Sequence, residues 1–125
     1  MTTSKEGVLI GKILLKHGSR PDLRLWRNET AVAWVGKRRG TTERGDIVLF
    51  KGANRILAGL CVGSADLIGL REPRGQFIAL EVKTKGVKVE EHQSKYLAVV
   101  RALGGIGEVV RSVDDVTKIL GEPPR

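Results

Sequence analysis

Two acidic residues and a lysine, Asp66, Glu81 and Lys83, form the part of this sequence best suited to chemistry. Asp66 begins one short apolar run, and Glu81 and Lys83 end the next, which starts at Phe77. Alternate side chains of a strand share a face, so Glu81 and Lys83 project the same way. Two carboxylates can hold a hard divalent cation, and a neighbouring lysine can meet a phosphate. The combination predicts metal-assisted cleavage of a nucleic acid.

Phosphodiester hydrolysis gives each of these groups a role. A metal ion polarises the phosphate and lowers the pKa of the attacking water, and carboxylates hold that ion. We therefore expect Asp66 and Glu81 to be metal ligands, with the backbone carbonyl of Val82 as a further oxygen ligand. An all-oxygen shell that keeps several waters suits Mg²⁺ or Mn²⁺. Lys83 is expected to orient the water or to stabilise negative charge on the phosphate.

Each of these residues also has a purely structural interpretation. Asp66 is then a turn-forming or capping acid, and Glu81 and Lys83 are an exposed cross-strand ion pair. The run Phe77–Leu80, together with Val82, is apolar enough for a central strand that is buried on both faces. A charged pair at the end of such a strand is costly unless it faces solvent or has a function. The neighbouring residues therefore weaken the structural interpretation of Glu81.

Helices and strands that would position these residues follow from apolar periodicity and from capping residues. The predicted helices cover residues 6–16, 90–103 and 113–120, with Ser4 and Ser112 as caps. The predicted strands cover residues 66–70, 77–83 and 107–111, and the first two are expected to be antiparallel neighbours joined by a turn at residues 73–75. This order of elements predicts an α/β domain with a mixed sheet covered by helices.

The segment between the first helix and Asp66 gives a weaker pattern. Partial alternation predicts a β-hairpin over residues 23–35, with its turn at residues 28–30. Residues 36–45 are rich in glycine and basic residues, which predicts an exposed loop. Residues 47–50 and 56–60 are expected to be short strands.

Composition limits the classes of protein to which the chain can belong. Its 125 residues are enough for one domain. The net charge of +8, from 22 basic and 14 acidic residues, favours a polyanionic partner. No apolar run is long enough to span a bilayer, so a membrane partner is not expected. A single cysteine, Cys61, cannot form an internal disulfide, which fits a reducing cytoplasm, and the lack of a Cys/His cluster argues against zinc.

The basic residues are spread over several clusters, which argues against a single disordered basic arm. Those at positions 37–39 form either a solvated loop or a clamp for phosphate groups. Ser64 follows a glycine that would let the backbone approach a phosphate closely. Trp34 is expected in the core or at a dimer interface, with base stacking as the alternative. The candidate DNA-binding residues are Lys37, Arg38, Arg39, Ser64, Lys85 and Lys88.

In their order along the chain, these motifs resemble the stand-alone VRR-NUC (virus-type replication-repair nuclease) domains found in phages. These domains belong to the PD-(D/E)xK, restriction-endonuclease-like superfamily. The matching pieces are the first helix with Glu6, residues 25–28, residues 63–69, residues 77–84, the helix with Gln93, and Gly104-Gly105 before a closing strand. One departure is Ala65, which stands where the superfamily name has a proline that supplies no ligand.

The resemblance implies one nuclease domain over residues 1–125, with a restriction-endonuclease-like mixed β-sheet flanked by helices. It implies Asp66, Glu81 and Lys83 as the catalytic core. It also implies that Glu6 approaches the metal, directly or through water, and that Gln93 faces the site. The structural alternatives are a helix-dipole role for Glu6 and a solvent-facing position for Gln93.

The same resemblance implies a homodimer that acts on branched DNA, such as four-way junctions, in the cytoplasm of the host if a phage encodes the chain. Two symmetry-related sites would suit the cutting of two strands. Two alternatives to an endonuclease remain open from the sequence. One is a nucleic-acid-binding module without catalysis, and the other is a junction-recognition subunit of a replication or repair complex.

Overall fold

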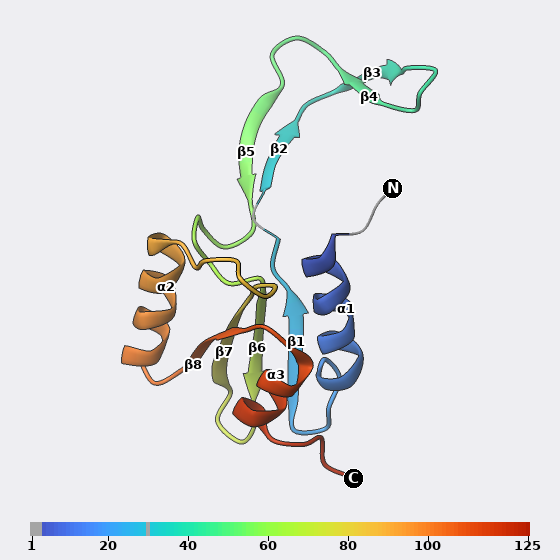
Figure 1. The fold of residues 1–125 in the computed structure, drawn as a ribbon. Helices are drawn as coiled ribbons and strands as arrows, with labels where there is room; N and C mark the ends of the chain where they lie inside the picture. The colour runs from blue at the N-terminus through green and yellow to red at the C-terminus, as the bar shows by residue number, and fades with distance from the viewer. Residues whose placement is uncertain (1–3, 30) are drawn as a thin grey trace. The chain divides into compact units, whose positions relative to one another are not determined.

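The computed structural model describes residues 4–29 and 31–125, which divide into two compact units. Unit 1 comprises Met1–Asn28 and Val62–Arg125, and unit 2 comprises Glu29–Cys61. The elements of unit 1 are α1 (Lys5–His17), β1 (Leu23–Arg27), β6 (Leu67–Arg71), β7 (Gln76–Val82), α2 (Glu91–Ala102), β8 (Ile106–Val110) and α3 (Val113–Leu120) (Figure 1). The elements of unit 2 are β2 (Ala31–Val35), β3 (Arg38–Thr41), β4 (Ile47–Leu49) and β5 (Asn54–Ala58).

Unit 1 is built on a four-stranded sheet in the order β1-β6-β7-β8. β6 is antiparallel to both β1 and β7, whereas β7 and β8 are parallel. The prediction of a mixed sheet in an α/β fold is confirmed, as is the antiparallel pairing of β6 with β7. Because β7 is a central strand, its residues from Ile78 to Val82 are buried, which explains their continuous apolar run.

Helices cover both faces of this sheet, and the alternation along β7 decides which residues meet which helix. Ile78, Leu80 and Val82 belong to the same core cluster as residues of α1 and α3, among them Ile13 and Val116. The intervening residue Ala79 packs instead in the cluster that contains Leu97 and Val100 of α2. α1 and α3 therefore lie on one face of the sheet and α2 lies on the other, as Figure 1 shows. Glu81, two residues after Ala79, projects toward the α2 face.

The predicted helix caps are present. The Ser4 hydroxyl accepts a hydrogen bond from the Gly7 backbone N–H at 3.0 Å, and the Ser112 hydroxyl accepts one from the Asp115 backbone N–H at 3.1 Å. These contacts satisfy backbone donors in the first turns of α1 and α3. None of the helices in the described part of the chain combines the length and the apolarity required to cross a membrane.

The predicted hairpin over residues 23–35 is wrong. β1 pairs with β6 in the sheet of unit 1, and β2 pairs with β5 in a separate two-stranded sheet. The reason is packing: Leu23 and Leu25 are buried in the main core, which places β1 beside β6 rather than beside the next strand. Thr30, predicted to lie in the turn of the hairpin, falls outside the described residues.

The segment at residues 36–45 is a loop only in part. It contains β3, which pairs antiparallel with β4 and has a register shift between Arg38 and Gly40. The strand was missed because its side chains are exposed and basic, so they show no apolar alternation. The two short strands expected after it are present as β4 and β5, although β5 begins earlier, at Asn54. The single nuclease domain over residues 1–125 stays a prediction.

Candidate active site

Asp66 and Glu81 lie side by side at the same end of two adjacent antiparallel strands, β6 and β7. Asp66 directly precedes β6, and Glu81 is the penultimate residue of β7. The Asp66 carboxylate accepts a hydrogen bond from the Val82 backbone N–H at 2.9 Å, and its backbone carbonyl accepts one from the Asn28 backbone N–H at 2.8 Å. The first contact holds the Asp66 side chain beside the end of β7, and the second holds its backbone beside Asn28.

Glu81 and Lys83 form a buried pair. Glu81 is 2% exposed and Lys83 is 9% exposed, and their Oε1 and Nζ atoms lie 3.6 Å apart. Gln93, in the first turn of α2, donates a hydrogen bond from Nε2 to the same Glu81 oxygen at 2.9 Å. The interpretation of Glu81 and Lys83 as an exposed surface pair is therefore excluded. Gln93 contacts the pair, so it is not merely a solvent-facing residue of the helix.

Gln93 is held in place from its other side as well. Its Oε1 atom accepts a hydrogen bond from the Glu90 backbone N–H at 3.0 Å, as part of a capping box at the start of α2. One amide side chain thus caps the helix and contacts Glu81. The first turn of α2 thereby determines where the Glu81 carboxylate points.

A third carboxylate, that of Glu6, reaches Asp66 from the first turn of α1. The pKa of Glu6 is raised, first by burial and then by the negative charge of Asp66, and a side-chain hydrogen bond with Asp66 adds to this rise. The charges of Lys83 and Arg27 act in the opposite direction. The structure therefore brings Glu6 to the acidic residues that are far from it in sequence.

These surroundings oppose negative charge on Glu81. Together they raise the pKa of Glu81 to about 8, and burial is the largest cause. The negative charge of Asp66, a hydrogen bond with its side chain and the charge of Glu6 contribute to this rise, and the positive charge of Lys83 acts against it. Acidic residues held this close together are a donor set whose mutual repulsion a bound cation would relieve.

The arrangement fits a divalent ion that keeps part of its water shell. Within residues 4–29 and 31–125, no three His, Cys, Asp or Glu side chains are gathered as a complete set of ligands. A cation here would therefore draw on the carboxylates of Asp66 and Glu81, on a backbone oxygen and on water. That partial shell is typical of Mg²⁺, which dehydrates reluctantly.

The loop that leads into Asp66 is held inside unit 1. Ser64 is buried, and its hydroxyl accepts a hydrogen bond from the Asn28 side-chain amide at 2.9 Å. The same Asn28 amide donates to the Ala65 backbone oxygen at 2.8 Å. Gly63 has a φ of +85°, and a Cβ atom there would lie 2.9 Å from the His92 ring and from the His92 backbone oxygen. The glycine thus permits close packing against the start of α2.

Sequence reasoning missed the contribution of Asn28, which was noted only within the run at residues 25–28. Its side chain and backbone together hold three positions of the loop, at Ser64, Ala65 and Asp66. The available signal was an amide residue directly after a strand, where its side chain can bond to a neighbouring backbone segment.

The predicted DNA-binding residues fall in both units. Lys85 and Lys88 are exposed in the segment that joins β7 to α2, shortly after Lys83. Lys37, Arg38 and Arg39 are exposed in unit 2. Ser64 belongs to unit 1, where it is buried beside Asn28.

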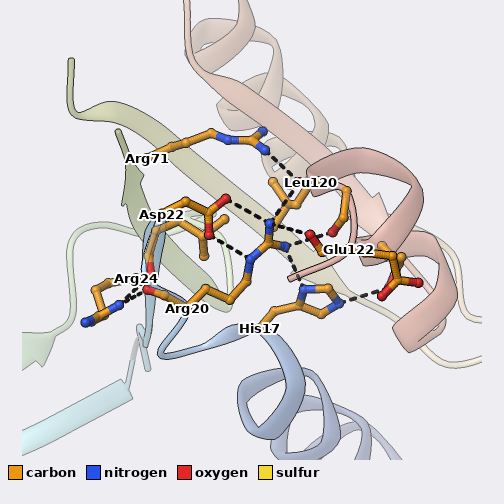
Figure 2. A network of polar contacts seen from close by, with 10 residues as sticks. His17, Arg20, Asp22, Arg24, Arg71, Leu120 and Glu122 are labelled. Atoms are coloured by element: carbon orange, nitrogen blue, oxygen red, sulfur yellow. Dashed lines mark hydrogen bonds and ion pairs between the residues drawn. The ribbon is translucent and has the colours of Figure 1, made fainter. Parts of the chain in front are cut away.

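A second polar network joins α1, β1 and the end of α3 at the opposite end of β6 from Asp66 (Figure 2). The buried Arg20 guanidinium forms two 2.9 Å hydrogen bonds with Asp22 and also donates to the backbone oxygens of Leu120, Gly121 and Glu122. Arg71 donates to the Leu120 oxygen as well. This network ties the segment that follows α3 to the first strand.

His17 completes this network as a neutral residue. Its Nδ1 lies 3.0 Å from Arg20 Nη1, and because arginine only donates, Nδ1 accepts. Its Nε2 atom therefore carries the proton and donates to the Thr117 hydroxyl at 3.0 Å. Burial and the charges of Arg20 and Lys16 lower the pKa of His17. A neutral ring cannot stabilise the C-terminal end of α1 through its charge.

The profile of the VRR-NUC domain family matches residues 38–114. That range includes Asp66, Glu81, Lys83 and Gln93, whereas Glu6 on α1 lies before it. No curated protein matches the sequence at a significant level.

Proposed function

We propose a function for this chain from one premise: it belongs to the VRR-NUC domain family, which is a family of nuclease domains. The proposed activity is metal-dependent endonucleolytic hydrolysis of DNA phosphodiester bonds. One observation carries the proposal most directly. The buried Glu81 carboxylate lies with Asp66 and Lys83 at one end of the sheet. The Glu6 carboxyl group contacts Asp66, and the Gln93 amide contacts Glu81.

Asp66, Glu81 and the Val82 carbonyl are the groups that would hold Mg²⁺ or Mn²⁺. When bound, such an ion supplies Lewis acidity and an activated water. The protein itself contributes position and charge. Gln93 orients the Glu81 carboxylate, and the Val82 N–H orients that of Asp66. Lys83 supplies a fixed positive charge for the negative charge that develops on the phosphate.

The proposal extends to the DNA and to the assembly. Lys85 and Lys88 follow Lys83 on an exposed segment, which suits contacts with phosphate groups on either side of the bond that is cut. Lys37, Arg38 and Arg39 would add contacts from unit 2. A homodimer acting on branched DNA remains part of the proposal, because paired cuts in two strands require two sites.

Substitutions that keep the shape of each acidic residue test the activity. Asp66→Asn retains an oxygen for the Val82 N–H, and Glu81→Gln retains the size of the buried side chain. We expect each variant to fold and to lose at least about 100-fold in cleavage rate, the scale for removing one group that stabilises transition-state charge. Asp114→Asn, which changes an exposed acidic residue on α3, is the matched control and should cleave normally.

The measurement is cleavage of single-stranded, duplex, flap and four-way-junction DNA with Mg²⁺ or Mn²⁺, and with a chelator. Full activity of either site variant would contradict the proposal, and so would full activity of the unaltered protein in excess chelator. DNA binding without cleavage by the unaltered protein would favour the non-catalytic binding module. Cleavage that begins only after a second protein is added would favour the junction-recognition subunit.

A further inference from the structure

Unit 2 contains an open hollow of about 660 Å³ that the nuclease site does not use. It is lined by Trp34, Ile47, Leu49, Phe50, Gly52 and Ala53. Its volume falls within the range of small-molecule binding sites. Trp34 is 60% exposed and Phe50 is 49% exposed, so Trp34 does not belong to the core as one sequence interpretation had it. The hollow thus presents two aromatic side chains on an apolar surface.

Strand pairing places arginines beside this hollow. Arg55 on β5 is directly opposite Trp34 on β2, and Arg38 on β3 is directly opposite Leu49 on β4. Residues that are directly opposite in antiparallel strands share a face of the sheet. Each arginine therefore projects from the same face as a residue that lines the hollow. The pattern combines an aromatic surface with two neighbouring cations.

A third cation lies next to the second aromatic residue. The Phe50 backbone N–H donates to the Lys37 backbone oxygen at 3.0 Å, which brings these two positions together. Unit 2 as a whole has six basic residues and three acidic ones, a net charge of +3. Such a surface repels another copy of itself and attracts a polyanion. Charge therefore favours nucleic acid over a second copy of this chain as the occupant.

We propose that this hollow binds an unpaired nucleobase, which stacks on Trp34 while Arg38 and Arg55 contact the flanking phosphates. A flat, apolar base matches the aromatic lining, and the cations match the chain of phosphates that connects successive bases. In an intact duplex the base faces are covered by their neighbours, so the hollow selects DNA that has unpaired bases. The inference rests on the proposed function, from which it takes DNA as the substrate. It adds that the preferred DNA contains unpaired bases.

Trp34 itself can report the contact. The chain has two tryptophans, so Trp26→Phe leaves Trp34 as the sole source of tryptophan emission. Combining it with Asp66→Asn and a chelator allows binding to be measured without cleavage. The probes are a single-stranded thymidine oligonucleotide, an oligonucleotide of the same length with abasic sites, and a blunt duplex. We expect the single strand to quench Trp34 emission and the other two probes to leave it nearly unchanged.

Substitutions in unit 2 separate stacking from charge. Trp34→Ala should weaken binding of the thymidine oligonucleotide about tenfold or more, whereas Trp34→Phe should retain most of it. Arg55→Gln should make binding less dependent on salt concentration, because one phosphate contact is lost. Val35→Ala is the matched control, since Val35 is exposed on the same strand but projects from the opposite face.

Two results would overturn the inference. One is equal affinity for the abasic and the thymidine oligonucleotides. The other is an affinity of Trp34→Ala for the thymidine oligonucleotide within about twofold of that of the parent protein. That result is expected if the hollow instead holds a second copy of the chain. In that case Trp34→Ala would also lose the dimer, which sedimentation would detect. If the protein cleaves DNA but substitution of Trp34 has no effect on oligonucleotide binding, this inference is rejected and the proposed function stands. Base binding that depends on Trp34, with no cleavage in the Asp66 test, would reject only the proposed function.

Discussion

Glu81 is a buried carboxyl group whose neighbours oppose its ionisation. Its pKa is raised to about 8, mainly by burial and by the negative charge of Asp66. In the metal-free protein at neutral pH, the group is therefore mostly protonated. Only the carboxylate form can act as a ligand, so binding of a cation must release this proton. In the proposed site, the same residue would thus couple metal binding to pH.

We predict that divalent-ion affinity rises with pH and levels off above about 8. Below that pH, each unit of decrease should weaken binding by up to about tenfold, because the proton competes with the metal for Glu81. Calorimetry of Mn²⁺ binding in two buffers with different ionisation enthalpies will count the protons released. Glu81→Gln should bind weakly and release no proton. Affinity that is constant between pH 6 and pH 9 would contradict the prediction.

The residues of the site differ in how far sequence could identify them. Asp66, Glu81 and Lys83 follow from the positions of acidic residues at the ends of apolar runs. The contact of Gln93 with Glu81 could not be derived from periodicity, because it depends on how α2 packs on the sheet. The role of Asn28 was harder still to predict, because its three contacts are with residues more than thirty positions away in the sequence.

At the scale of elements, the network around Arg20 joins three segments that are distant in sequence. One guanidinium contacts His17 at the end of α1, Asp22 before β1, and three backbone oxygens from Leu120 to Glu122. A hydrogen bond from Arg20 is also the main reason that the pKa of Asp22 is lowered. The last helix is thereby fastened to the first strand through one side chain.

We predict that Arg20→Met lowers the free energy of unfolding by about 3–5 kcal/mol, because it leaves Asp22 and the carbonyl oxygens without their donor. Arg20→Lys should restore little of this loss, since an ammonium group cannot form the same two parallel bonds with Asp22. Urea unfolding followed by circular dichroism measures the effect. Arg74→Met, in an exposed turn, is the control. A loss below about 1 kcal/mol in Arg20→Met would show that the network contributes little.

Elements were predictable where local signals define them. α1 and α3 were found because Ser4 and Ser112 cap them, and the boundaries of β6, β7 and β8 were each predicted to within one residue. The hairpin over residues 23–35 failed because the partner of β1 is β6, which is about forty residues further along. Pairing over such a distance depends on burial of Leu23 and Leu25 against other elements, which a local pattern does not contain.

At the scale of the whole molecule, unit 2 is an insertion whose two ends meet. Ala31 at the start of β2 pairs with Ala58 at the end of β5. Opposite residues of antiparallel strands are about 5 Å apart, so a tight turn can connect them. The core clusters of unit 1 draw no residue from unit 2 within the described part of the chain. Unit 1 therefore has the contacts required to fold without the insertion.

We predict that replacing Val32–Leu57 with an Asn-Gly turn leaves the melting temperature of unit 1 within about 4 °C of that of the full chain, a change of less than about 1 kcal/mol. The shortened protein should lose the preference for oligonucleotides with bases over abasic ones. Thermal unfolding by circular dichroism and binding by anisotropy measure the two effects. A shortened protein that fails to fold would show that unit 1 depends on unit 2.

The order of strands in the sheet has a consequence for the newly made chain. β7 carries Glu81 and Lys83, and it acquires its second neighbour only when β8 has been synthesised. The Lys83 backbone N–H bonds to the oxygen of Val110, and Glu81 needs Gln93 from the intervening helix. Because chains emerge from the ribosome N-terminus first, the proposed site cannot assemble until the chain has been made through Val110. A nascent chain that ends before Val110 would therefore lack the assembled site.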